Sequence, residues 1–182
     1  MREDEPMSEE APPGIAPILG VRFAVGSPID AFLSALAERL RARGLRVAGH
    51  VQMRVAPEGN RERSEMRLLD LASGRALPIS ENRGAGAGGC QLDSRALSAV
   101  AQELEQMLPG AADILIVNRF GRSEAEGRGL RGAIEKALHA GIPVVIAYRD
   151  AYAEGWHAFH GGLARDCAPD TGAVLAALGL AE

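Results

Sequence analysis

Apolar residues recur along this chain in two patterns: short continuous runs, and longer stretches with helical spacing. Four runs are typical of buried strands: GVRFAV, LRVAGHVQMRV, ADILIVN and IPVVIAY. Apolar spacing and capping residues predict helices over residues 29–43, from Asp93 or Ser94 to about 108, over about 129–140 and over 171–178. Strands and helices that alternate in this way form βαβ units. We therefore expect an α/β domain with a mostly parallel sheet and helices on both faces.

A hairpin is expected to interrupt this alternation. The runs MRLLDL and RALPIS flank Ala-Ser-Gly at residues 72–74, which predicts two strands joined by a short turn. The first 17 residues, MREDEPMSEEAPPGIAP, are acidic and proline-rich and contain no apolar run of the kind found in signal peptides. We expect a disordered tail over residues 1–17 and a single domain over residues 18–182.

Composition narrows the class of protein. Hydrophobic residues make up 47% of the chain, which is typical of a globular domain, and the net charge of −4 gives no support for a broad nucleic-acid-binding surface. No apolar run reaches the roughly 18 residues of a membrane span. Two cysteines are too few for a disulfide framework and lack zinc-site spacing. We expect a cytoplasmic protein that binds neither nucleic acid nor membrane.

The loop NRFGRSEAEGRG follows the strand ADILIVN and is the strongest candidate for a ligand site. Ligands of α/β folds collect at the carboxyl ends of the strands. The three arginines of this loop can make bidentate contacts with an oxyanion, and its two glutamates can hold those arginines or act on a bound water. The alternative is a solvated, salt-bridged loop whose glutamates cap the following helix. The candidate ligand-binding residues of the loop are Asn118, Arg119, Phe120, Gly121, Arg122, Glu124 and Arg128.

Two other loops have a composition suited to anions. After the first strand, VGSPID has no lysine and is too short for a Walker phosphate loop, although the following helix, with Ser27 as N-cap and Pro28 as its first residue, can still attract an anion. RGAGAGGC can wrap an anion with its amides, or it is a flexible lid or linker. Cys90 is either a reactive thiol or a small packed residue at a helix start. The ligand-binding candidates in and after this loop are Gly84, Gly86, Gly88, Gly89, Gln91 and Asp93.

Three histidines and one glutamine leave structural and functional interpretations open. His50 and Gln52 alternate on one strand and therefore share a face, where they serve as structural residues or as ligand contacts. His157 and His160 lie three apart, on one face if the segment is helical. Their sequence neighbourhood offers no clear carboxylate or thiol to complete a zinc site, so whether they bind metal stays open.

Several separated motifs in the same order carry a family resemblance: GHVQ, the hairpin, GGCQLD, ILIVNRFGRSEAEGRGLRGAIEKAL and GIPVVIAY. From Gly20 to Leu178 the chain resembles a bacterial family of unknown function whose members are often encoded near molybdate-transport genes. That family is similar to a divergent branch of the P-loop nucleoside-triphosphatase fold. In typical members of that fold the corresponding strand ends in Asp-Glu, which supplies a magnesium ligand and a base. Here Asn118 and Arg119 stand in those places, which argues against magnesium-assisted phosphoryl transfer.

Three hypotheses of function follow. The first is a binding protein for a small oxyanion or a phosphorylated ligand, held by the arginines of the 118–129 loop and by residues 84–89. The resemblance implies molybdate as the oxyanion. Molybdate is a dianionic tetrahedron like phosphate, so arginines and backbone amides suit either anion. The second is a nucleotide or phosphoester hydrolase with Glu124 as base, assisted by Cys90 or His50. The third is a non-catalytic interaction protein that forms a homo-oligomer through these motifs.

Overall fold

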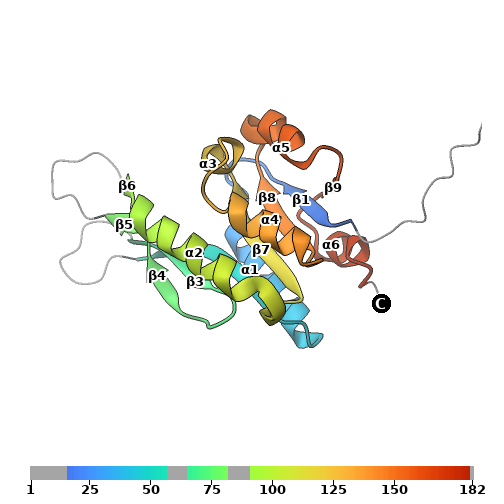
Figure 1. The fold of residues 1–182 in the computed structure, drawn as a ribbon, viewed down its shortest axis with the longest axis horizontal. Coiled ribbons are helices and arrows are strands. Elements are labelled where there is room, and N and C mark those ends of the chain that lie inside the picture. The colour runs from blue at the N-terminus through green and yellow to red at the C-terminus, as the bar shows by residue number, and fades with distance from the viewer. Residues whose placement is uncertain (1–15, 57–64, 82–90, 181–182) are drawn as a thin grey trace, which may run out of the picture.

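The computed structural model describes residues 16–56, 65–81 and 91–180 (Figure 1). The strands are β1 (Ile18–Arg22), β2 (Val47–Val55), β3 (Glu65–Asp70), β4 (Ala76–Pro78), β5 (Ser80–Glu81), β6 (Gln91–Leu92), β7 (Ile114–Phe120), β8 (Val144–Tyr148) and β9 (Ala164–Cys167). The helices are α1 (Ile29–Ala42), α2 (Ser94–Ala111), α3 (Arg122–Ala125), α4 (Arg131–His139), α5 (Ala153–His160) and α6 (Thr171–Ala177), with a 3₁₀ turn η1 (Asp150–Tyr152) before α5. Residues 1–15 of the expected tail lie outside these ranges.

Seven of the described strands form one sheet, in the order β4-β3-β2-β7-β8-β1-β9. The pairs from β2 to β9 are all parallel, and β3 and β4 are antiparallel at one edge. This confirms the expected α/β architecture with an inserted hairpin. The hairpin turns where the Asp70 carboxylate accepts hydrogen bonds from the backbone of Ala72 and Ser73, and Gly74 supplies a positive φ of 73°. β5 and β6 form a separate two-stranded ribbon.

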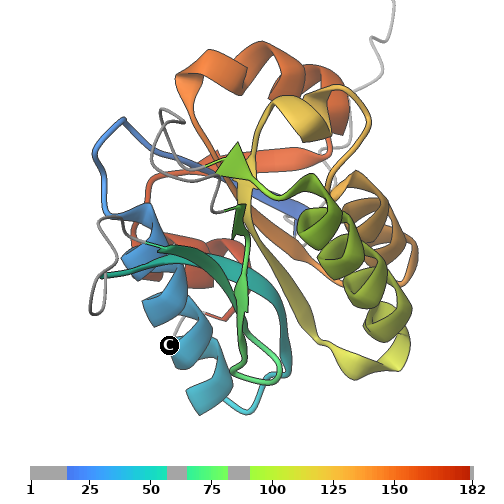
Figure 2. The same ribbon diagram turned by 90° about the vertical axis from the view of Figure 1, so that its left-hand side faces the viewer.

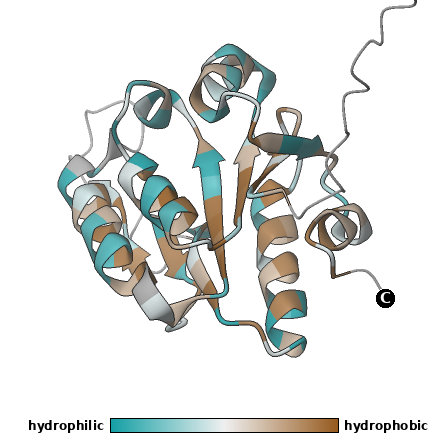
Figure 3. Cartoon of the chain, turned by 45° about the vertical axis from the view of Figure 1, so that its right-hand side comes forward, coloured by the Kyte–Doolittle hydropathy of each residue, from teal (hydrophilic) through white to brown (hydrophobic). Residues whose placement is uncertain are grey.

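Helices cover both faces of the sheet (Figures 1 and 2). α1 and α6 pack on one face, where Leu33, Leu36 and Leu40 of α1 are fully buried at helical spacing. α2, α4 and α5 pack on the other face. Because both faces are covered, the central strands are continuously apolar rather than alternating, and Figure 3 shows this contrast with the polar outer faces of the helices.

The short strand β6 and the edge strand β9 were not expected from the sequence. β9, with the sequence ARDC, pairs with β1 at the edge of the sheet and is mostly exposed. An edge strand buries little surface, so its polar residues give no apolar run to recognise.

The connections fix where a ligand site belongs. β1 leads into α1 on one face, whereas its neighbour β8 leads through η1 into α5 on the opposite face. In open α/β sheets, ligands bind outside the carboxyl ends of the strands where neighbouring connections diverge in this way. The segments at that edge are residues 23–28 after β1, 121–130 after β7 and 149–152 after β8.

Candidate functional site at the carboxyl edge of the sheet

The end of β7 contains a bulge. Between Val117 and Phe120, β7 has one more residue than the facing part of β8. The two residues between them, Asn118 and Arg119, therefore lie where the regular alternation of side chains is broken. Bulges commonly re-aim side chains in this way.

Arg119 crosses from β7 to the first turn of α1. Its Nη2 donates to both carboxylate oxygens of Asp30, at 3.1 Å each, and its guanidinium lies 5.9 Å from the centre of the Phe23 ring. The two side chains are 42% and 35% exposed, so this ion pair contributes less than about 1 kcal/mol to stability. The contact therefore joins an arginine at the end of β7 to an aspartate in the first turn of α1.

Asn118 is buried, with 7% of its surface exposed, and its Oδ1 has no hydrogen-bond partner among the described residues. It lies directly before Arg119 in the bulge of β7. An unpaired buried polar atom costs about 1–3 kcal/mol. Such an atom beside a charged pair marks a place where a ligand or water can bind.

The start of α1 differs from the sequence expectation. The N-cap is Pro28, which has no side-chain cap, and Ser27 instead accepts from the Ile29 backbone through its carbonyl. In the described part of the chain, the backbone N–H groups of Asp30 and Ala31 have no acceptor. The chain turns at Val25 and Gly26, where the Ser27 N–H donates to the Ala24 carbonyl at 3.2 Å, and Pro28 follows as the N-cap.

The loop after β7 is built around Glu124. Its Oε2 accepts from the Gly121 backbone at 3.0 Å and its Oε1 accepts from the Leu130 backbone at 3.1 Å, and the side chain is buried. Gly129 has φ +63°, and a Cβ there would lie 2.2 Å from Glu124 Oε1. The carboxylate thus joins the two ends of the loop, and both of its oxygens are occupied.

Arg122 and Arg128 lie on the surface of this loop and share one partner. Arg122 Nε donates to Glu126 Oε1 at 2.7 Å, and Arg128 Nη2 donates to Glu126 Oε2. The hydrogen bonds from Arg122 and then Arg128 lower the pKa of Glu126. Phe120 points away from these arginines, because its ring is buried against Trp156 of α5 at a centroid distance of 5.4 Å.

Two further arginines end neighbouring strands at the same edge, and the sequence reasoning did not single them out. Arg22, at the end of β1, donates through Nε to Asp150 Oδ1 at 2.6 Å. Arg149 follows β8, lies over the Tyr152 ring at 5.7 Å and has no carboxylate partner within the described ranges. The loop after β7 was chosen because it directly follows a buried strand. Arg149 meets the same criterion, since it directly follows the strand IPVVIAY.

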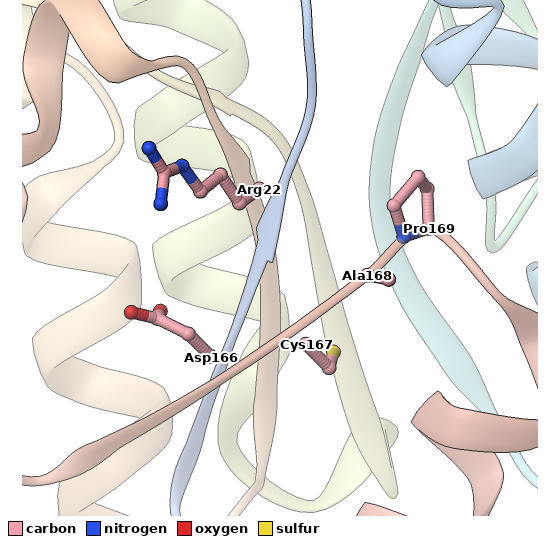
Figure 4. A pocket seen from close by; sticks show the side chains of 5 residues that line it. All are labelled: Arg22, Asp166, Cys167, Ala168 and Pro169. Atoms are coloured by element: carbon pink, nitrogen blue, oxygen red, sulfur yellow. The ribbon is translucent and has the colours of Figure 1, made fainter.

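A hollow of about 340 Å³ lies beside Arg22, and residues 166–169, at the end of β9 and just after it, form its other wall (Figure 4). The side chains of Arg22 and Asp166 point to one side of β1, and the Cys167 sulfur lies on the other side. Burial, and then the nearby Asp166 carboxylate, raise the pKa of the Cys167 thiol to about 11. Cys167 is therefore a protonated packing residue at neutral pH.

His50 lies on the opposite face of the sheet from Asp30. It shares the face of Ala48, which packs in the α2 and α4 core, whereas Asp30 belongs to α1. Its Nδ1 has no hydrogen-bond partner among the described residues, and burial lowers its pKa. Gln52, two residues further on, donates to Met66 Sδ at 3.4 Å. The sheet therefore separates these two residues from the Arg119–Asp30 contact.

His157 and His160 bond to each other on α5. The backbone N–H groups of Gly162 and Ala164 donate to His160 Nδ1, so the proton of His160 resides on Nε2 and points to His157 Nδ1 at 3.2 Å. A protonated Nε2 has no lone pair for a metal ion. The described residues also contain no group of three or more potential metal ligands.

The glycine-rich candidates Gly84, Gly86, Gly88 and Gly89, and Cys90 after them, lie outside the described residues. Gln91 belongs to β6, whose backbone pairs with β5. Asp93 is confirmed as the N-cap of α2, because its Oδ1 accepts from the backbone of Arg95 and Ala96 at 2.9 and 3.1 Å.

Comparison with known proteins identifies the fold and the family. A solved structure described as a human cancer-related nucleoside triphosphatase superposes with a TM-score of 0.56 at 14% identity, over 82% of this chain and 85% of that one. The architecture is therefore that of the P-loop nucleoside triphosphatases. Among the helices of the described ranges, none is long and apolar enough to cross a membrane.

A relative in Bradyrhizobium diazoefficiens, the molybdenum import ATP-binding protein ModC 2, is 32% identical over 146 residues. The match covers 80% of this chain but only 16% of that longer protein. Residues 18–176 match a family model described as a protein of unknown function, DUF2478. Since this match spans most of the sequence, the chain belongs to the DUF2478 family.

Proposed function

We propose that this chain is a binding domain for a small tetrahedral oxyanion, or for the phosphate group of a phosphorylated ligand, at the carboxyl edge of its sheet. The observation that carries the proposal is the set of arginines at the ends of three adjacent parallel strands: Arg22 on β1, Arg119 on β7 and Arg149 after β8. Guanidinium groups match the geometry of tetrahedral oxyanions. Arg149 has no carboxylate partner in the described chain, so of the three arginines its guanidinium is the most available to a ligand.

The same edge favours binding over phosphoryl transfer. The segment after β1 has no lysine, and Asn118 and Arg119 stand where the resembling triphosphatases have acids. Without an acid there, nothing at this strand end holds a magnesium ion. Glu124, the candidate base of the hydrolase hypothesis, already accepts two backbone hydrogen bonds, which favours its role as the organiser of the loop.

Molybdenum handling is the biological setting that we propose. A relative of this chain is a molybdenum import ATP-binding protein, of which the matched segment makes up 16%. The matched segment lacks a Walker lysine in this chain, so we propose that it is a separate module rather than the ATP-hydrolysing part. Such a module would bind molybdate and report its level to the transporter. Arg122 and Arg128 would extend the basic surface beside the site.

Isothermal titration with molybdate, tungstate, phosphate, sulfate and ATP tests this proposal. We expect at least one tetrahedral anion to bind at submillimolar concentration, and Arg149→Gln to weaken its binding about 10-fold or more, as expected for the loss of one charge-assisted contact. Arg46→Gln is the matched control, because Arg46 pairs with Asp113 at the amino edge of the sheet, away from the proposed site. The proposal fails if no anion binds at millimolar concentration, or if the two variants weaken binding equally.

A further inference from the structure

We infer that Asp30 is an internal counter-ion that competes with an incoming oxyanion for Arg119, so that ligand binding opens the contact between β7 and α1. This inference rests on the proposed function and names how its site is regulated. Asp30 and Arg119 are 89 residues apart in the sequence and meet only at the carboxyl edge of the sheet.

The hydrogen bonds between Asp30 and Arg119 are long enough for a ligand to compete with them. Arg119 uses a single nitrogen, Nη2, which lies 3.1 Å from both carboxylate oxygens. By contrast, Arg46 holds Asp113 through Nε, Nη2 and its backbone N–H, at 3.1, 2.7 and 2.8 Å. Charge-assisted bonds of about 2.7–2.9 Å are the strong ones. The other guanidinium nitrogens of Arg119 have no acceptor in the described chain and remain available to a ligand.

Groups that suit an oxyanion surround this contact. The N–H groups of Asp30 and Ala31 are unpaired at the start of the 14-residue helix α1, whose dipole favours negative charge there. Asn118, next to Arg119 in the bulge of β7, is more than nine-tenths buried and has an unpartnered side-chain oxygen. That oxygen is an acceptor, so it needs a donor such as a bound water and does not itself hold the anion.

The loop that leads into α1 is open to solvent. A Cβ added to Gly26, which has φ +85°, would meet nothing within 4 Å, and the neighbouring Val25 is 84% exposed. A tetrahedral oxyanion that displaced the Asp30 carboxylate would exchange one acceptor of Arg119 for another. It would also gain the unpaired donors of α1, which the Asp30 side chain leaves unused.

Displacement has a cost and a consequence. A dianion beside a carboxylate is repelled, so Asp30 lowers the affinity of the site as long as it is charged. When Asp30 leaves Arg119, the ion pair that joins the end of β7 to the first turn of α1 is lost. Ligand occupancy is thereby coupled to α1, whose outer face is exposed and accessible to another module.

Titration calorimetry of the full chain with phosphate and with molybdate tests the inference. Asp30→Asn keeps the shape of the side chain and removes its charge, and we expect about 10-fold tighter anion binding. Asp30→Asn combined with Arg119→Gln should lose that gain. Asp113→Asn is the matched control, because it removes a carboxylate from an arginine pair at the other end of the sheet and should leave affinity unchanged. Circular dichroism establishes that each variant is folded.

The outcomes separate this inference from the proposed function. Wild-type binding that Asp30→Asn does not strengthen overturns the inference and leaves the proposed function standing. Binding by Asp30→Asn through Arg119, with none by the wild type up to millimolar anion, supports the counter-ion and overturns the proposed function. Absence of binding in both proteins overturns both, and an equal gain in Asp113→Asn overturns the inference.

Discussion

Trp156 Nε1 donates to Asp166 Oδ1 at 3.0 Å, and this bond joins α5 to the edge strand β9. Asp166 also accepts from the Tyr148 hydroxyl, and burial together with this bond raises the pKa of Tyr148 to about 12. Gly20 of β1 lies under both groups, since a Cβ there would be 2.3 Å from Asp166 Oδ1 and 2.7 Å from the Trp156 ring. One carboxylate therefore satisfies two aromatic donors where β8, β1 and β9 meet.

Asp166→Ala should lower the free energy of unfolding by about 1–3 kcal/mol, because it leaves the buried Trp156 Nε1 and the Tyr148 hydroxyl without an acceptor. Asp166→Asn retains an oxygen acceptor and should cost less. Urea denaturation followed by tryptophan fluorescence measures both, since Trp156 is the single tryptophan of the chain. Equal stability of wild type and Asp166→Ala would contradict this account.

Glu124→Gln should destabilise the loop after β7. A glutamine has one acceptor oxygen, so its NH₂ group must face either the Gly121 or the Leu130 N–H, and we expect a loss of about 1–2 kcal/mol. Hydrogen exchange at these two amides should accelerate with it. Glu126→Gln, which alters an exposed carboxylate in the same loop, should leave both amides protected. Unchanged protection in Glu124→Gln would show that the carboxylate does not hold the loop.

Two glycines of that loop give a matched comparison. Gly127 and Gly129 both have positive φ, of 81° and 63°, so alanine at either position costs about 1 kcal/mol in backbone strain. Only at Gly129 would the new Cβ also meet Glu124, whereas at Gly127 it would meet nothing within 4 Å. Thermal denaturation should therefore show a larger loss for Gly129→Ala than for Gly127→Ala. Equal losses would mean that Glu124 moves aside freely.

Asn118→Leu should stabilise the ligand-free protein. The leucine removes a buried oxygen that has no partner, and we expect a gain of about 1 kcal/mol in the free energy of unfolding. Chemical denaturation measures this gain, and calorimetry on the same sample measures anion binding. Asn118→Asp supplies the control, because a carboxylate at this position should weaken both stability and anion binding. A Leu variant that is less stable than the wild type would argue that Asn118 is satisfied in solution.

The sequence predicted the features that depend on local pattern. The continuous apolar runs of β7 and β8 identified the buried parallel strands. The charged segment 118–129 was expected to be a loop after the first of these strands, but its first three residues belong to β7. The Arg119–Asp30 contact could not be predicted, because it depends on a bulge and on a crossover that brings residues 89 positions apart together. The separation of His50 from that contact was hidden for a similar reason. Which helices cover each face of the sheet depends on the order of the strands, and this order was not known from the sequence.

The stability of the protein should fall as pH decreases from about 7 to 5.5. Burial lowers the pKa of both His50 and His160 in the folded state, and a neighbouring His157 lowers that of His160 further. The unfolded chain, with histidine pKa values near 6.5, therefore binds more protons than the folded chain in this range. Stability is full above about pH 6.5 and is lost as pH falls toward the lowered folded values. Urea denaturation at several pH values measures the slope. His160→Asn, whose side-chain oxygen can still accept from the Gly162 N–H, should reduce the slope, and an unchanged slope would exclude His160 as a source of the pH dependence.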